Sequence, residues 1–207
     1  MNNRSHPRRQ LRKSLRTARR SLTPGFQHYA AQRICEFLAT DPIFRRSRHI
    51  GFYMANDGEI NPGKIAKMAA GRGKHCYLPL ISDAIRPWER TRLLFQTYRP
   101  LIGNLEKNHY GILEPRYQPR LIINLAMLDL VIVPLVAFDS HLNRLGMGKG
   151  YYDRSFGRSL RWRRPLLLGL AYTSQRVQQL DSNKLDVPLD GVLTEQGISW
   201  KDELLGR

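Results

Sequence analysis

The 207-residue sequence predicts one α/β domain, with a mostly parallel sheet flanked by helices on both faces in a Rossmann-like arrangement. Helical patterns alternate with short strand patterns along the chain, which is typical of parallel strands joined by helices. The middle strand patterns, above all residues 128–136, are continuous apolar runs, as expected where both faces of a sheet are buried. No linker divides the sequence, so we expect residues 1–207 to form a single domain.

Two helices are expected at the start of the chain. Residues 7–21 should form a basic helix whose apolar residues have helical spacing: Leu11, Leu15, Ala18 and Leu22. We expect this helix, within residues 1–22, to pack near the functional site. A second helix should begin at Thr23 and Pro24, which suit the N-cap and the first helical position, and it should end before Pro42.

Strands and helices alternate from residue 49 onward. The strand patterns are residues 49–54, 76–80, 93–98, 128–136, 166–172 and 191–194. A helix should begin at Pro62 and end at Gly71 or Gly73, and another should begin near Tyr151. Residues 99–120 are rich in Pro, Gly, Asn and Tyr, so we expect an irregular connection there.

The charge of the chain is its unusual property. The 34 Lys and Arg residues outnumber the 17 Asp and Glu residues, and the formal net charge is +17. Such an excess favours an anionic partner and carries no information about the fold. A nucleic-acid-binding protein is therefore one alternative, but no nucleic-acid-binding motif is visible, and we expect only non-specific binding through charge.

The cysteines and the apolar runs bear on the compartment. Two cysteines, Cys35 and Cys76, cannot form a disulfide framework, which favours a reducing compartment. No stretch approaches the roughly 18 apolar residues that a membrane span needs. The basic N-terminal region also lacks the apolar segment of a secretory signal. We therefore expect a cytoplasmic protein that does not contact membranes; an Arg-rich transit peptide is the alternative, because the first 35 residues contain no acidic residue. A monomer is a separate expectation.

Two loops are candidates for a ligand site. In open α/β sheets, ligands bind beyond the carboxyl ends of the strands. Residues 56–59 follow the first strand pattern, and residues 138–153 follow the most apolar one. Both loops carry charged residues, so we expect them to meet at one site.

The second loop has alternating glycines at Gly146, Gly148 and Gly150, immediately before a helix. Alternating glycines allow backbone N–H groups to converge on an anion, and Arg144 and Lys149 add two positive charges there. The pattern favours a phosphate site, although its spacing matches neither a Walker loop nor a dinucleotide fingerprint. A tight strand-to-helix turn is the alternative.

Asp153 lies three residues after the last glycine. A carboxylate beside a polyphosphate is repulsive unless a cation lies between them, and Mg²⁺ held by one or two carboxylates is the usual arrangement. Asp186 or Asp190 could supply the second carboxylate. A carboxylate that stabilises the first turn of a helix, or a turn residue, is the alternative in each case.

The arginines of the first helix allow two interpretations. Arg8 and Arg12 lie one turn apart, so both can reach one anion. A solvated basic face is the alternative. Arg19 and Arg20 lie farther along the same helix, and we expect them to be beyond reach of the site.

Residues 133–139 and the following glycine loop with its Tyr-Tyr-Asp sequence, residues 144–153, resemble the 5-formyltetrahydrofolate cyclo-ligase family. The resemblance continues at residues 8–12, 57–59, 110–115 and 186–190. It implies an α/β fold related to sugar-phosphate isomerases and CoA transferases. It also implies an ATP- and Mg²⁺-dependent ring closure of 5-formyltetrahydrofolate, with or without a polyglutamate tail, which yields 5,10-methenyltetrahydrofolate, ADP and phosphate.

The resemblance implies three sets of site residues. ATP would be bound by Arg8, Arg12, Arg144, Leu145, Gly146, Met147, Gly148, Lys149, Gly150, Tyr151 and Tyr152. Mg²⁺ would be held by Asp153 and Asp186, the folate would be bound by Met54, Glu59 and Tyr110, and the expected catalytic residues are Arg144, Lys149 and Tyr152. The alternative is another phosphate-binding enzyme of the same fold, which would not need Asp153 as a metal ligand.

Overall fold

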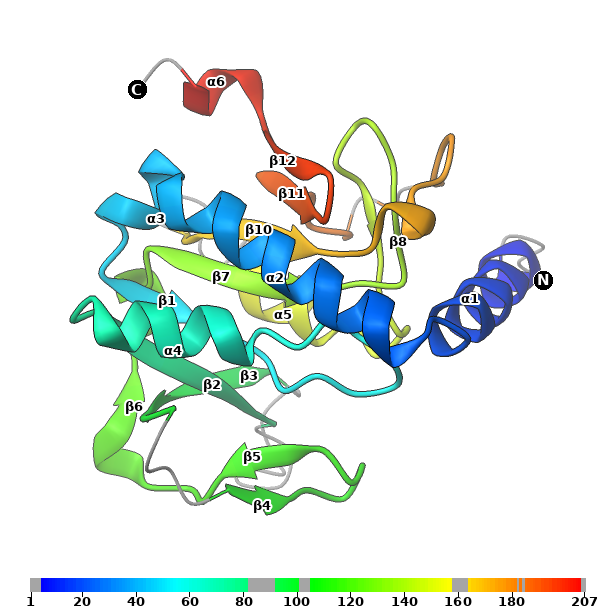
Figure 1. The fold of residues 1–207 in the computed structure, drawn as a ribbon. Helices are drawn as coiled ribbons and strands as arrows, with labels where there is room; N and C mark the ends of the chain where they lie inside the picture. Colours follow the sequence, from blue (N-terminus) through cyan, green and yellow to red (C-terminus); the bar gives the residue numbers. More distant parts are fainter. Residues whose placement is uncertain are drawn as a thin grey trace.

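The computed structural model describes residues 5–81, 92–100, 105–157, 164–181, 183 and 185–205. Its main feature is an eight-stranded sheet (Figure 1). The strands, in spatial order, are β12 (Gly197–Trp200), β11 (Gly191–Thr194), β10 (Leu166–Leu170), β7 (Leu130–Pro134), β1 (His49–Gly51), β2 (His75–Ile81), β3 (Leu93–Tyr98) and β6 (Ile122–Ile123). The expected α/β class is confirmed.

The centre of the sheet is parallel and its edges are antiparallel. β11, β10, β7, β1 and β2 run in the same direction, whereas β12, β3 and β6 are antiparallel to their neighbours. Taken in chain order, the parallel strands have the spatial order 2-1-3-4-5 of doubly wound folds. Leu130 at the start of β7 pairs with Ile50 on one side and Leu166 on the other, so β7 lies in the interior of the sheet.

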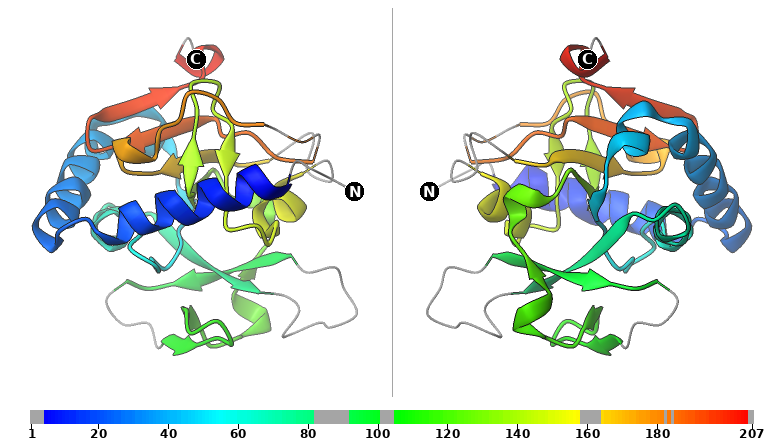
Figure 2. Two further views of the ribbon diagram at one scale, coloured as in Figure 1. Left: turned by 90° about the vertical axis from the view of Figure 1, so that its right-hand side faces the viewer. Right: turned by 90° about the vertical axis from the view of Figure 1, so that its left-hand side faces the viewer.

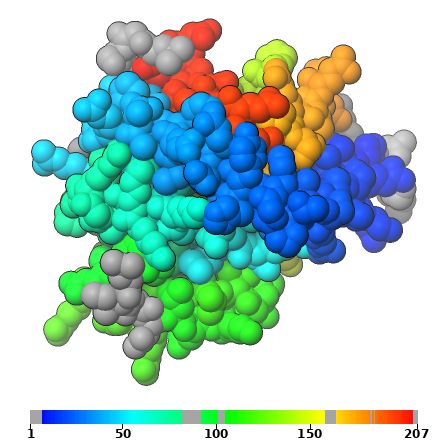
Figure 3. Space-filling model, in the orientation of Figure 1, coloured from blue at the N-terminus to red at the C-terminus, as the bar shows by residue number. Residues whose placement is uncertain are grey.

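Helices cover the two faces unequally. α2 (Pro24–Thr40) and α4 (Gly63–Gly71) cover one face and hide most of the sheet from that side (Figures 1 and 3). On the other face, α5 (Tyr151–Phe156) packs through Phe156. In β7, Leu130 and Ile132 join the first core, and Val131 and Val133 join the second, with none of them exposed. Burial on both faces explains why this strand is a continuous apolar run.

The first helix, α1 (Ser5–Arg20), lies apart from α2 and α4 (Figure 2). Its predicted apolar stripe is in contact with the rest of the protein, because Leu11 and Leu15 pack against the small core formed by Ala137, Leu145 and Leu180. Ala137 belongs to β8 (Ala137–Phe138) and Leu145 to β9 (Arg144–Leu145). These two strands pair with each other in the loop that follows β7.

Several short elements depart from the predicted pattern. Thr23 caps α2 as expected, but a further helix, α3 (Pro42–Arg46), follows at once because the Asp41 carboxylate accepts a hydrogen bond from the Phe44 N–H (2.7 Å). The expectation of an irregular 99–120 segment is wrong, since β4 (Leu105–Lys107) and β5 (Leu113–Pro115) form a hairpin; residues 101–104 lie outside the described residues. These strands are too short to give a periodic signal.

The remaining elements are the short 3₁₀ turns η2 (Pro119–Leu121), η3 (Leu125–Met127) and η5 (Thr173–Gln175), and the last helix, α6 (Asp202–Leu205). Throughout the part of the chain that the structure describes, no helix combines the length and the apolar character of a membrane span.

Candidate functional site

The two predicted loops meet because of the strand order. β1 and β7 are neighbours in the sheet, but the chain leaves β1 toward β2 on one side and leaves β7 toward β10 on the other. At such a switch point the two loops separate and leave a crevice. A cavity of about 660 Å³ opens here, and α1, both loops and the β4–β5 hairpin contribute to its walls.

All but one of the predicted site residues line this cavity. They are Arg8, Arg12, Met54, Glu59, Tyr110, Arg144, Gly146, Met147, Gly148, Lys149, Gly150, Tyr151, Tyr152, Asp153 and Asp186. Leu145 is the exception, because its side chain is fully buried against Ala137 and Leu180. It therefore supports the loop from below instead of facing a ligand.

The glycine loop presents backbone to the cavity. Gly148 and Gly150 have φ angles of 95° and 67°, a left-handed conformation that residues with side chains adopt only at a cost. Gly150 is also the N-cap of α5. The Arg12 guanidinium donates from Nε to the Gly146 carbonyl (2.9 Å) and so ties α1 to this loop. Basic residues of α1 and of the loop, among them Arg12 and Lys149, line the same cavity.

Arg144 and Asp153 form a half-buried ion pair within the same loop. Arg144 Nη2 donates to Asp153 Oδ1 (2.6 Å), and the Val187 N–H donates to the same oxygen (3.1 Å). The Arg144 side chain is only 4% exposed, and its Nε has no hydrogen-bond partner among the described residues. A buried donor without a partner is costly, and this one belongs to a side chain that lines the cavity. The guanidinium also lies 5.7 Å from the centre of the Tyr152 ring.

Asp186 is held by the first turns of α1. Arg8 Nη2 donates to Asp186 Oδ2 (2.9 Å), and both residues line the cavity together with Asp153. Asp190, the other candidate for a second carboxylate, is not part of this lining. It is buried and forms a bidentate pair with Arg164, at 2.5 and 2.8 Å, which is a structural arrangement.

Glu59 lies on the loop after β1, where the chain makes a tight turn. The Glu59 N–H donates to the Asn56 carbonyl (3.0 Å), and the Asn56 N–H donates to Glu59 Oε2 (3.1 Å). Burial raises the pKa of Glu59 to about 7, and the nearby Arg19 opposes this rise. Near neutral pH this carboxyl group can therefore both accept and donate a hydrogen bond. Met54, on the same loop, packs against the main core and lines the cavity.

Tyr110 connects the β4–β5 hairpin to the glycine loop. It lies between the two strands, is 41% exposed, and its hydroxyl lies 2.9 Å from the hydroxyl of Tyr151. The Lys149 ammonium lies 5.7 Å from the centre of the Tyr110 ring, within the range of a cation–π contact. An exposed aromatic ring at the edge of the cavity offers a flat surface to a planar ligand.

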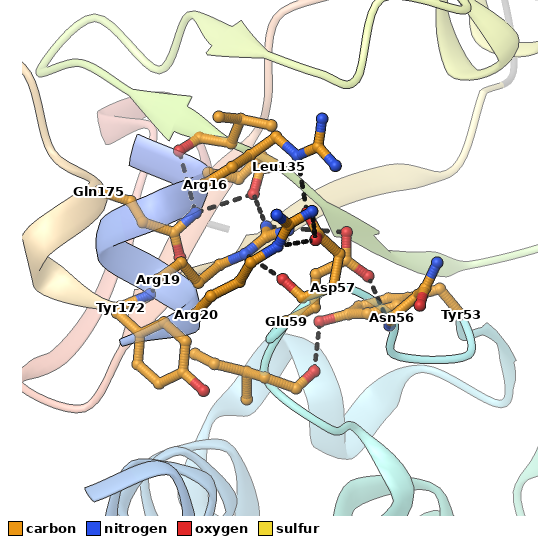
Figure 4. A network of polar contacts seen from close by, with 12 residues as sticks. Arg16, Arg19, Arg20, Tyr53, Asn56, Asp57, Glu59, Leu135, Tyr172 and Gln175 are labelled. Carbon is orange, nitrogen blue, oxygen red and sulfur yellow. Dashed lines mark hydrogen bonds and ion pairs between the residues drawn. The ribbon is translucent and has the colours of Figure 1, made fainter. Parts of the chain in front are cut away.

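Arg19 and Arg20 do not line the cavity, as expected, but both contact Asp57, which does. Both side chains donate to the Asp57 carboxylate, in a network that joins α1 to the turn before Glu59 (Figure 4). The Arg19 side chain is 1% exposed. The available signal was the spacing of Arg12 and Arg19, which lie seven residues apart and therefore on the same helical face.

The fold and the cavity together define an α/β protein with a cavity lined by charged residues at the switch point of its sheet. Residues 4–195 match the 5-formyltetrahydrofolate cyclo-ligase family. The chain is 35% identical to 5-formyltetrahydrofolate cyclo-ligase of Haemophilus influenzae over 188 residues, which cover 90% of this chain and 96% of that protein. It is 33% identical to the Escherichia coli K12 protein of the same name over 187 residues, with coverage of 90% and 99%.

A comparison with solved structures leads to the same family as the comparison of sequences. The NMR structure of Aquifex aeolicus 5,10-methenyltetrahydrofolate synthetase matches this chain with a TM-score of 0.76 and 26% sequence identity. The match covers 93% of this chain and 92% of the Aquifex aeolicus chain. The chain therefore belongs to the 5-formyltetrahydrofolate cyclo-ligase family and is an enzyme of the ligase class. The resemblance seen in the sequence is confirmed.

Proposed function

We propose that this enzyme converts 5-formyltetrahydrofolate to 5,10-methenyltetrahydrofolate while ATP is converted to ADP and phosphate, with Mg²⁺ as the metal. The observation that carries the proposal is the wall where Arg8 and Arg12 of α1 face the glycine loop, with Arg12 bonded to Gly146. This wall combines positive side chains with exposed backbone, which suits a polyphosphate. Glu59 lines another part of the same cavity and provides a carboxyl group for the second substrate.

The carboxylates of the cavity fit a magnesium ion that also binds phosphate. Among the described residues, hydrogen bonds to Asp153 use Oδ1 and those to Asp186 use Oδ2, so each carboxylate keeps a second oxygen. Within the described ranges, no group of three or more His, Cys, Asp or Glu could hold a metal ion. Mg²⁺ commonly takes one or two carboxylates, phosphate oxygens and water. When bound, the ion would neutralise charge on the transferred phosphoryl group.

The chemical problem is a poor electrophile with a poor leaving group. The formyl oxygen on N5 attacks the γ-phosphorus of ATP, a C–O–P linkage forms, and ADP leaves. N10 then attacks the activated carbon, the N10 proton is lost, and the C–O bond breaks with its electrons departing on phosphate. The five-membered ring closes and one phosphate is released, so atoms and charge balance.

In these two reaction steps the protein positions the substrates and neutralises charge, as in other phosphoryl transfers. Arg8 and Arg12 would hold the phosphate chain of ATP. Arg144 has an unpartnered buried N–H and Lys149 lines the same cavity, so both would neutralise charge on the γ-phosphoryl oxygens. The half-buried Tyr152 ring lies against the Arg144 guanidinium.

The folate would occupy the side of the cavity nearer Glu59. An ionised Glu59 can accept hydrogen bonds from ring N–H groups, which a pteridine presents in pairs. Met54 provides apolar contact, and the exposed Tyr110 ring provides a stacking surface. We also propose that the enzyme is located in the cytoplasm and acts as a monomer.

The decisive experiment mixes the protein with 5-formyltetrahydrofolate, ATP and Mg²⁺ and follows the absorbance of the methenyl product. We expect product only when both ATP and Mg²⁺ are present. Undiminished turnover in a chelator without divalent ion would exclude the metal part, and turnover without ATP would exclude phosphorylation. A sugar-phosphate isomerase or CoA transferase would form no methenyl product under any of these conditions.

The division of the cavity between two ligands can be tested separately. We expect Glu59→Ala to weaken binding of 5-formyltetrahydrofolate more than binding of ATP, because Glu59 lies on the loop after β1 and not on the glycine loop. Calorimetry with each ligand alone measures this. Equal losses for both ligands would show that the two loops are wrongly assigned.

A further inference from the structure

Asp57 is the centre of an unusual cluster of charge. Its side chain is only 8% exposed, yet it contacts three arginines of α1. Arg16 Nε donates to its Oδ2 (2.7 Å), Arg19 Nη2 donates to the same oxygen (2.9 Å), and Arg20 binds Oδ1. Figure 4 shows the three guanidinium groups converging on this one carboxylate.

The turn that carries Asp57 is strained in a specific way. Asp57 has a φ of 56° and the following Gly58 has a φ of 76°, so two successive residues are left-handed. Two such residues and the Glu59-to-Asn56 backbone hydrogen bond (3.0 Å) are the features of a type I′ turn. For a residue with a side chain this conformation is unfavourable. The arginine contacts offset that cost and hold Glu59 at its place in the cavity.

Arg19 joins this turn to the second loop of the switch point. Its Nε donates to the Asp57 carbonyl (3.0 Å), and its Nη1 donates to the Leu135 carbonyl (3.1 Å) just after β7. Gln175 reinforces the second contact, because its Nε2 also donates to the Leu135 carbonyl (2.8 Å). All three nitrogens of the Arg19 guanidinium therefore bind groups on two separate loops.

The same helical face carries the arginines of the cavity. Arg8, Arg12, Arg16 and Arg19 follow one another at intervals of three or four residues, which places them in one stripe along α1. Arg19 lies at the end of the stripe nearest the turn, while Arg8 and Arg12 contact Asp186 and the glycine loop. Anchoring the C-terminal end of α1 thus determines where its N-terminal arginines lie.

We propose that Arg19 and Asp57 are positioning residues, which form a clasp between α1 and the two switch-point loops and so fix both substrate sides of the cavity in relation to each other. The proposal rests on the proposed function for the identity of the two substrates. On one side the clasp holds the helix that presents Arg8 and Arg12 to the phosphates. On the other it holds the turn that presents Glu59, whose Oε1 lies 3.7 Å from Arg19 Nη1.

The test compares Michaelis constants for both substrates in Arg19→Lys and Asp57→Asn. Lysine keeps the charge of Arg19 but cannot supply three planar donors. Asparagine keeps the shape of Asp57 and an acceptor oxygen, so this variant should fold even if the first does not. We expect each variant to raise the KM for ATP and the KM for 5-formyltetrahydrofolate about tenfold or more. Arg12→Ala should raise only the KM for ATP, and Glu59→Ala should raise mainly the KM for 5-formyltetrahydrofolate.

Arg33→Gln is the matched control for charge. It removes one positive charge from α2, where Arg33 pairs with Glu36 on the surface, and it should leave both constants unchanged. Thermal unfolding of every variant establishes that assays are made on folded protein. A residue with only a structural role would lower the amount of active enzyme, and therefore kcat, without changing either KM.

Unchanged constants in both clasp variants, or a change for one substrate alone, would overturn the proposal. The double variant Arg19→Lys with Asp57→Asn should raise each KM by less than the product of the two single effects, because the two residues share the contact between Arg19 Nη2 and Asp57 Oδ2. Wild-type turnover is measured first, since its absence refutes the proposed function and not the clasp. Calorimetry with ATP alone and with 5-formyltetrahydrofolate alone then provides the same comparison without turnover.

Discussion

Replacing Glu59 by glutamine should change how the stability of the protein depends on pH. The Glu59 side chain is 11% exposed, and burial raises its pKa from 4.5 to about 7 in the folded protein. In the unfolded chain the group has its ordinary value. Between pH 4.5 and pH 7 the folded state therefore binds more protons than the unfolded state, so stability falls as pH rises through this window.

The size of the effect follows from the same two values. At about 1.4 kcal/mol for each pH unit, ionisation of Glu59 costs the folded state about 3 kcal/mol above pH 7, relative to pH below 4.5. Glutamine has nearly the same shape, can still accept from the Asn56 N–H, and does not ionise. Glu59→Gln should therefore match the wild type at pH 4 and be more stable than it by about 3 kcal/mol at pH 8.

Urea unfolding of both proteins at pH 4, 5, 6, 7 and 8 measures this difference. Subtracting the two free energies of unfolding at each pH removes the contributions of groups that titrate independently of Glu59. A difference that stays constant from pH 4 to pH 8 would refute the reasoning and show that Glu59 is ionised throughout. A difference that grows in favour of the wild type would show that the Arg19 contact outweighs burial.

Three further predictions concern the glycine loop. Asp153→Asn should abolish most turnover and, because it leaves the buried Arg144 without its charged partner, should lower the free energy of unfolding by about 1–3 kcal/mol in urea titrations. Arg12→Ala should raise the KM for ATP roughly tenfold or more, since a charged hydrogen bond contributes about 1.5–3 kcal/mol; an unchanged KM would remove α1 from the ATP site. Gly150→Ala, at a φ of 67°, should cost about 1 kcal/mol, seen as a lower melting temperature.

The sheet and most of the cavity could be predicted because the patterns that indicate them lie within short stretches of the sequence. The continuous apolar run of β7 indicates burial on both faces, and the alternating glycines before α5 indicate backbone that lines a cavity. The topology then places the two loops together, since the loops that follow neighbouring parallel strands lie at the same edge of the sheet. This is why residues as distant as Glu59 and Asp153 could be assigned to one site before the structure was known.

The arrangement of α1 could not be predicted in the same way. Its arginines look alike in the sequence, and only tertiary contacts distinguish the buried Arg19 from a solvated basic residue. The partner of that residue, Asp57, lies 38 positions away on a loop whose charge suggested contact with a ligand and not with α1. The pairing of Arg144 with Asp153 was equally invisible, because the sequence suggested that both would face a ligand and not each other.

The contacts of α1 also determine the order in which the cavity can form during folding. Arg8 and Asp186 are 178 residues apart in the chain, and Arg12 lies 134 residues from Gly146. Closing such long loops adds little to the entropic cost of folding, because that cost grows only with the logarithm of loop length. It does delay the contacts, which depend on strands that are made and paired later. As the chain emerges from the ribosome, Arg19 can reach Asp57 early, whereas Arg8 and Arg12 must wait for most of the remaining sequence before their partners are made.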